Sequence, residues 1–182
     1  MNGTAQRDAR PMARITRIAP WLSAALASVG LAAVALADGG RAMPANVPAV
    51  YTQECASCHL AYPPGLLPAR SWRRIMAGLD RHYGTDASLD AQTRQPIDAW
   101  LQAHAGTTKR ATEEPPQDRI TRSAWFERKH RKIDPAVWLL ASVKGPAQCA
   151  ACHGDAQRGR FDEHELRMPG GLDARQRRAW ND

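Results

Sequence analysis

The sequence has few of the large apolar side chains that ordinarily form a protein core. Aromatic residues make up 6% of its 182 residues, with only two Phe and three Tyr, and the one long apolar run, residues 18–37, lies near the N-terminus. Beyond residue 37, Leu, Ile, Val and Phe together account for 20 of 145 residues. A chain this poor in apolar residues would ordinarily be disordered. An ordered structure therefore requires that something other than side chains supply much of the core.

Cysteine is equally scarce, and all four cysteines fall into two copies of one pattern, Cys55-Ala56-Ser57-Cys58-His59 and Cys149-Ala150-Ala151-Cys152-His153. Two such pairs that share one zinc ion are usually separated by about 15–20 residues. Here 91 positions separate Cys58 from Cys149. A redox-active disulfide of the thioredoxin type is also disfavoured, because the strand pattern of that fold is missing and the histidine after each pair would be a coincidence.

The C-x-x-C-H pattern is the attachment signature of a c-type haem. Two thiols three positions apart lie about one helical turn apart, so both can add to the vinyl groups on one edge of a porphyrin. The following His59 or His153 then lies under the ring and can bind the iron. The sequence therefore predicts two covalently attached haems. It also predicts a small, mainly α cytochrome with short helices around both haems and little or no sheet.

The N-terminus has the pattern of an export signal. Four arginines precede an apolar stretch from Trp21 to Val34, and Ala35-Leu36-Ala37 matches a cleavage site before Asp38. An uncleaved membrane anchor is the alternative, since residues 18–37 are barely long enough to span a bilayer. In both cases the remaining chain reaches the periplasm, where c-type haem is attached in bacteria.

The positive charge does not indicate nucleic-acid binding. The formal net charge is +7, but the first 37 residues carry four Arg and one Asp, which leaves +4 on the remainder. The propionates of two haems would bring the loaded protein close to neutrality. A local basic patch that docks an acidic redox partner is the interpretation we favour.

Composition divides the chain into a signal peptide, a linker, a first haem region, a second linker and a second haem region with a tail, over residues 1–37, 38–49, 50–106, 107–118 and 119–182. Helical periodicity predicts one helix over 70–83, ended by Gly84, and another from Asp90 to His104 that Pro96 should kink or split. Asp134-Pro135 predicts a helix start. The stretch 123–132 is ambiguous, and no structure is predicted for the polar tail beyond Gly154.

The second iron ligand of each haem cannot be chosen from spacing alone. The candidates outside the motifs are His82, His104, His130, His164, Met43, Met76 and Met168. His82 and His104 lie on or beside apolar helix faces, which would meet a haem. His130 lies in a basic run typical of a solvated surface, and Met168 precedes a proline, as haem-binding methionines do in single-haem cytochromes.

Several runs resemble the bacterial dihaem cytochrome c family typified by the Rhodobacter protein that partners the sphaeroides haem protein. The resemblance extends over roughly Val50 to Pro169 and is carried by residues 55–72, 79–84, 128–131, 148–153 and 159–162, with Tyr62-Pro63-Pro64-Gly65-Leu66-Leu67-Pro68 the most specific part. It implies bis-histidine haems, with His82 completing the first and His130 the second. The family pattern usually lacks a histidine at His104. The tail departs from it and leaves Met168 as a weaker candidate.

We therefore expect a periplasmic electron carrier, not an enzyme, that transfers electrons from a membrane or soluble donor to a haem-protein acceptor. The resemblance implies the haem-protein partner and a membrane cytochrome b as one donor. Membrane contact would occur only through an uncleaved N-terminal segment. The alternative is a dihaem enzyme or a gas-binding sensor with one open or labile iron. The short chain and the number of histidines disfavour the enzyme, whereas nothing in the sequence excludes the sensor.

The low apolar content generates a first prediction, namely that the haem-free protein does not fold. Circular dichroism of chain produced without haem attachment should show no cooperative thermal transition, because the haems supply most of the buried apolar surface. The haem-loaded protein measured in parallel should melt cooperatively. A cooperative melt of the haem-free chain would contradict this expectation.

Overall fold

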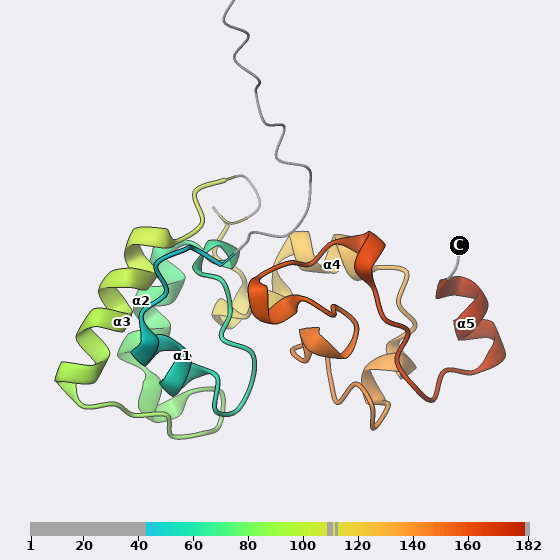
Figure 1. Ribbon diagram of the computed structural model, residues 1–182, viewed down its shortest axis with the longest axis horizontal. Coiled ribbons are helices and arrows are strands. Elements are labelled where there is room, and N and C mark those ends of the chain that lie inside the picture. The colour runs from blue at the N-terminus through green and yellow to red at the C-terminus, as the bar shows by residue number, and fades with distance from the viewer. Residues whose placement is uncertain (1–42, 109–110, 112, 181–182) are drawn as a thin grey trace, which may run out of the picture. The chain divides into compact units, whose positions relative to one another are not determined.

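Short helices make up the regular structure of the chain. The computed structural model describes residues 43–108, 111 and 113–180 (Figure 1). The predicted signal peptide and residues 38–42 of the first predicted linker lie outside these residues. No β-strand occurs in the described ranges, where only two isolated bridges pair extended residues. The prediction of a mainly α fold without a sheet is therefore confirmed.

Three α-helices form the first part of the fold, α1 (Ala49–Cys55), α2 (Ala69–Ala77) and α3 (Ala91–His104), and the last two pack against each other (Figure 1). Their apolar faces meet in one buried cluster. In α1, Tyr51 places its ring 4.7 Å from that of Trp100 in α3. Leu67 and Ile97 are almost completely buried in the same cluster.

Local sequence explains where these helices begin and end. The carboxylate of Asp90 caps α3 by accepting from the backbone N–H of Thr93 at 2.9 Å. This helix continues through Pro96 as a single element, so the predicted split does not occur. The expected helix over 70–83 is shorter, because α2 ends at Gly78, whose N–H bonds to the carbonyls of Arg74 and Ile75. A 3₁₀ turn, η2 (Leu79–Arg81), follows.

The second part has less regular structure. The stretch that was ambiguous in sequence forms α4 (Ala124–His130), capped by the Ser123 hydroxyl. Asp134-Pro135 starts a 3₁₀ helix, η5 (Pro135–Leu139), and the second cysteine motif forms η6 (Cys149–Ala151). The remaining 3₁₀ turns are η1 (Pro64–Leu66), η3 (Pro116–Asp118), η4 (Ile120–Arg122), η7 (Ala156–Arg158) and η8 (Glu163–Glu165).

The tail, for which no structure was expected, ends in α5 (Ala174–Trp180). Asp173 and Gln176 cap this helix reciprocally, since each side chain accepts from the backbone N–H of the other. Leu172 is buried with Val137 and Val143, and Trp180 packs against the same small cluster. No helix in the described ranges is long and apolar enough to cross a membrane.

Candidate haem sites

The first cysteine motif begins at the C-terminal end of α1. Cys55 is the last residue of the helix, and Cys58 and His59 follow in the next turn. The Nδ1 atom of His59 lies 2.7 Å from the carbonyl oxygen of Leu60. Because a carbonyl can only accept, this bond makes Nδ1 the donor and leaves the Nε2 lone pair available to a metal.

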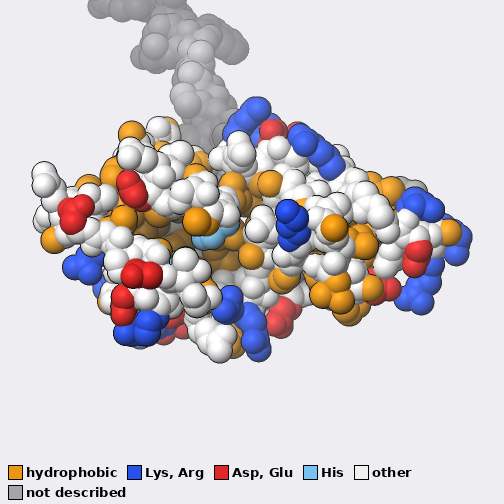
Figure 2. All heavy atoms as spheres, turned by 90° about the horizontal axis from the view of Figure 1, so that it is seen from below, with side chains coloured by type: hydrophobic (Ala, Val, Ile, Leu, Met, Phe, Trp, Pro, Cys, Tyr) orange, Lys and Arg blue, Asp and Glu red, His pale blue; other side chains and the backbone are white. Residues whose placement is uncertain are grey.

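A cavity of about 370 Å³ opens beside this motif. Its volume lies in the usual range for small-molecule and cofactor sites, about 300–1,000 Å³. Both cysteines and His59 line it on one side, and His82 lines it from the turn after η2. Trp72 and Leu79 contribute to its largely apolar wall. Figure 2 shows a hollow of this kind, with histidine atoms among hydrophobic side chains.

The rings of His59 and His82 face each other across this cavity. Their centres lie 6.1 Å apart and their planes differ by 27°. Two metal–nitrogen bonds of about 2 Å each, extended by the radii of two imidazole rings, separate the ring centres by about 6 Å. The spacing therefore fits one metal atom held between two imidazoles, as in a six-coordinate haem.

The second motif lies beside a similar cavity of about 370 Å³. Cys149, Cys152 and His153 line one side of it, and His130, the last residue of α4, lines another. The rings of His130 and His153 are again 6.1 Å apart, with planes at 77°. The Nδ1 of His130 donates to the Phe126 carbonyl at 2.8 Å, which leaves its Nε2 available to a metal. The Nδ1 of His153 is buried without a partner among the described residues.

Burial favours the neutral form of three of the facing histidines, His82, His130 and His153. Burial lowers the pKa of His82 and of His130, and it lowers that of His153 to about 4. The facing histidine lowers the pKa of His82 and His153 further. A neutral imidazole is the form that has a lone pair for a metal.

Two of the cysteines lie in surroundings that favour the uncharged form of sulfur. Burial raises the pKa of Cys55 and of Cys149 to about 11. A thioether to haem carries no charge and fits such surroundings. In the described ranges, no three or more His, Cys, Asp or Glu side chains are placed to hold a metal ion.

The other candidate ligands are not placed in facing pairs. His104 packs its ring 5.3 Å from that of Trp100, bonds to the Trp100 carbonyl and lines neither cavity. His164 lines the second cavity but is exposed, and Met168 is 42% exposed and lines neither. Met76 is buried in the wall of the first cavity. The geometry thus groups His59 with His82 and His130 with His153.

Two aromatic residues at these sites were missed by sequence reasoning. Tyr62 stacks on His59 with ring centres 4.9 Å apart, and its hydroxyl donates to the carbonyl of Ala147 at 2.8 Å. Tyr62 and Ala147 are 85 positions apart, so no local sequence pattern could have predicted this contact. Trp180 lines the second cavity from the tail. The Asp173–Gln176 capping pattern was the sequence signal that could have indicated its helix.

Comparison with known proteins agrees with this geometry. The family model described as dihaem cytochrome c matches residues 51–161. The structure of a dihaem cytochrome c from Rhodobacter sphaeroides is 38% identical with a TM-score of 0.57, and the match covers 66% of this chain and all of the other. The structure of DHC purified from the same organism is 41% identical with a TM-score of 0.54, covering 64% and 98%.

A dihaem cytochrome type c from Shewanella baltica OS155 is also similar. It is 41% identical with a TM-score of 0.60, and the match covers 68% of this chain and 96% of that one. No curated protein matches. These relatives are matched over nearly their whole length at identities well above those that indicate only a shared fold.

Each cavity is lined by a cysteine pair of its own, which predicts that each pair attaches its own haem. Replacing Cys149 and Cys152 with Ser should leave a protein with one covalently attached haem, because the first cavity keeps both of its thiols. Replacing Cys55 and Cys58 should do the same for the second cavity. Mass spectrometry of the intact chain counts attached haems directly, and two haems on either double variant would contradict the assignment.

Proposed function

The chain belongs to the dihaem cytochrome c family, and from this premise we propose that it carries electrons in the periplasm between a membrane or soluble donor and a haem-protein acceptor. As a family member it binds two covalently attached c-type haems, one at each cysteine pair, and transfers electrons. Each bound haem supplies a one-electron iron couple. The proposal adds the compartment and the partners, of which a membrane cytochrome b is one candidate donor.

The observation that supports the carrier role most is the pair of facing imidazoles in each cavity. We assign His59 and His82 to the first iron, and His153 and His130 to the second. Two imidazoles leave no coordination position for a substrate, which favours electron transfer over enzymatic chemistry. They also give a lower reduction potential than a His/Met pair, because methionine ligation raises it.

Hydrogen bonds to the backbone and apolar packing orient the proposed ligands. Backbone carbonyls accept from Nδ1 of His59 and of His130, which fixes each ring and turns Nε2 away from that carbonyl. Apolar side chains around both cavities exclude water and so limit the reorganisation of solvent when the charge on the iron changes. We take residues 50–106 and 119–182 as the two haem regions and 107–118 as their linker.

One observation favours the alternative of a gas-binding role at a labile iron. The ring of His82 makes no hydrogen bond to another described residue, whereas His59 and His130 are each anchored to a carbonyl. A ligand without such an anchor is more easily displaced.

Carbon monoxide distinguishes the carrier from this alternative. Adding it to the reduced, haem-loaded protein should leave the optical spectrum unchanged, because both irons are closed by imidazole. His82→Ala and His130→Ala should each bind CO at one haem. His104→Ala is the matched control and should behave like the wild type, since its ring contacts Trp100 and lines neither cavity.

Binding of CO by the wild type would favour the gas-binding alternative. Two unchanged low-spin spectra in His82→Ala or His130→Ala would reject the corresponding ligand assignment. A response in His104→Ala alone would point to a different ligand pair.

The periplasmic location predicts a defined mature N-terminus. Protein recovered from the periplasmic fraction should begin at Asp38 and carry two haems, as N-terminal sequencing and the intact mass would show together. A chain that stays with the membrane and begins upstream of Ala37 would indicate the uncleaved anchor. Haem-loaded protein recovered only from the cytoplasm would contradict export.

A further inference from the structure

The two proposed distal histidines are supported in different ways. His130 belongs to α4, its Nδ1 donates to the Phe126 carbonyl, and its ring stacks on the Phe126 ring at 3.9 Å between centres. His82 follows η2, and its ring makes no hydrogen bond to any other described residue. His82 therefore depends on neighbouring segments to keep its orientation.

The turn after His82 is strained. Tyr83 has a φ of 50°, in the left-handed region that bulky residues rarely adopt, and Gly84 continues the turn with a φ of 98°. The turn closes when the N–H of Thr85 donates to the carbonyl of His82 at 3.0 Å. A non-glycine residue in such a conformation is strained and persists only where its surroundings fix it.

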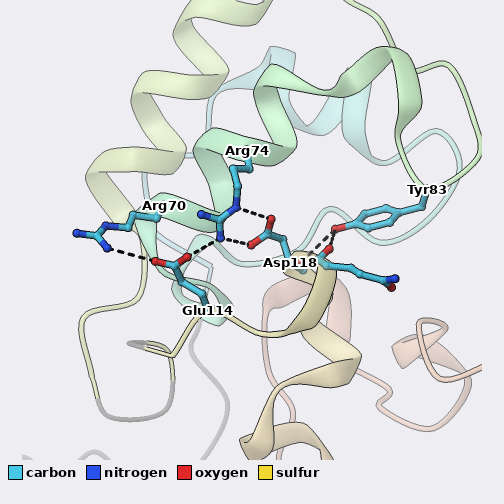
Figure 3. Close-up of polar contacts among 6 residues, drawn as sticks. Arg70, Arg74, Tyr83, Glu114 and Asp118 are labelled. Atoms are coloured by element: carbon cyan, nitrogen blue, oxygen red, sulfur yellow. Dashed lines mark hydrogen bonds and ion pairs between the residues drawn. The ribbon is translucent and has the colours of Figure 1, made fainter.

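The end of the second predicted linker and the residue that follows it hold Tyr83 in this conformation. The Tyr83 hydroxyl donates toward the carbonyl oxygens of Gln117 and Asp118, each at 3.1 Å. The guanidinium of Arg119 lies 4.2 Å above the centre of the Tyr83 ring, a cation–π contact. Figure 3 shows the Tyr83 hydroxyl directed at the backbone beside Asp118. The Tyr83 ring in turn contacts the ring of His82 edge-on, with centres 4.9 Å apart.

Arg74 of α2 ties this segment to the first haem region. Its guanidinium makes two bonds to the Asp118 carboxylate, Nε to Oδ2 at 2.8 Å and Nη2 to Oδ1 at 2.6 Å. The same Nη2 lies 2.7 Å from Glu114 (Figure 3). Arg74 lowers the pKa of Asp118 through these bonds. Single exposed ion pairs contribute little, but a bidentate pair within a network fixes geometry.

We propose that Arg74, Tyr83, Glu114, Asp118 and Arg119 form a clamp that keeps His82 on the first iron, and that loosening the clamp opens this iron, but not the second, to a small diatomic ligand. The proposal rests on the role of His82 as an iron ligand. Opening breaks the iron–imidazole bond and leaves the lone pair on His82, and the entering ligand donates its own lone pair, so no oxidation state changes. Tyr83 is thus a positioning residue.

The rate of CO binding to the reduced, haem-loaded protein tests the clamp. Tyr83→Phe removes both hydroxyl contacts but keeps the ring, and Arg74→Gln removes the ion pairs from the other side. Both variants should bind CO at one haem, at a rate at least about tenfold above the upper limit that the unchanged wild-type spectrum sets, equivalent to about 1.4 kcal/mol, which is within the range for a typical hydrogen bond.

Arg73→Gln is the matched control. Arg73 is the exposed neighbour of Arg74 in α2, and Gln102, at 3.4 Å, is its only hydrogen-bond partner among the described residues. This variant should bind CO no faster than the wild type. The second haem is an internal control, because a general loosening of the fold would open both irons whereas loss of the clamp opens one.

His82→Ala, measured in the same series, separates this inference from the ligand assignment. If His82→Ala binds CO and both clamp variants stay as closed as the wild type, the clamp is wrong and the assignment stands. If His82→Ala stays closed, the assignment fails and the clamp fails with it. If Tyr83→Phe does not retain both haems, Arg74→Gln carries the test, because it changes a side chain that is half exposed. Opening of both haems in the clamp variants would also overturn the proposal.

Discussion

The distance between two facing imidazoles is the constraint on which the rest of this structure depends. One histidine of each pair comes with its cysteines, so the motif itself places it. In the ligand assignment proposed above, the fold brings the other to the opposite side of the cofactor. His82 lies 23 positions after His59, whereas His130 lies 23 positions before His153. The two regions therefore reach the same 6.1 Å separation with opposite chain order. Short helices and 3₁₀ turns suit this task, since each can change the chain direction within a few residues.

The two regions differ in the size of their buried apolar clusters and in how their second histidine is anchored. Beside the first cavity lies a cluster of eight buried residues, six of them from α1, α2 and α3, and these residues would retain some mutual contact without a cofactor. The second region has only Val137, Val143 and Leu172 in its buried cluster, supplemented by partly buried neighbours. Its stability must depend more strongly on the bound haem. The two proposed iron ligands show the reverse difference. His130 is anchored by a hydrogen bond within its own helix, whereas His82 has no such bond and depends on contacts with neighbouring segments. Stability and ligand anchoring are thus distributed differently between the two sites.

Local signals in the sequence predicted those parts of the fold that local chemistry determines. The haem motifs, the cap at Asp90 and the start at Asp134-Pro135 all appear where the sequence indicated them. The end of α2 was misjudged, because a helical pattern that continues past Gly78 also fits a helix followed by a 3₁₀ turn. The helix α5 was not predicted, although the capping pattern of Asp173 and Gln176 indicates its start. What the sequence could not supply were contacts between distant residues, such as Tyr62 with Ala147 or Tyr83 with Asp118.

These distant contacts show why composition is a weak guide to the role of the 107–118 segment. Its prolines and polar residues are typical of a linker, yet its last residue, Asp118, and the three that follow form part of the wall of the first cavity. Ile120 lines both cavities, Leu66 of the first region lines the second, and Ala147 beside the second motif lines the first. Cavities that share a wall residue are neighbours, so haems bound in them would lie close together. The segment that joins the haem regions in sequence therefore also joins their sites in space.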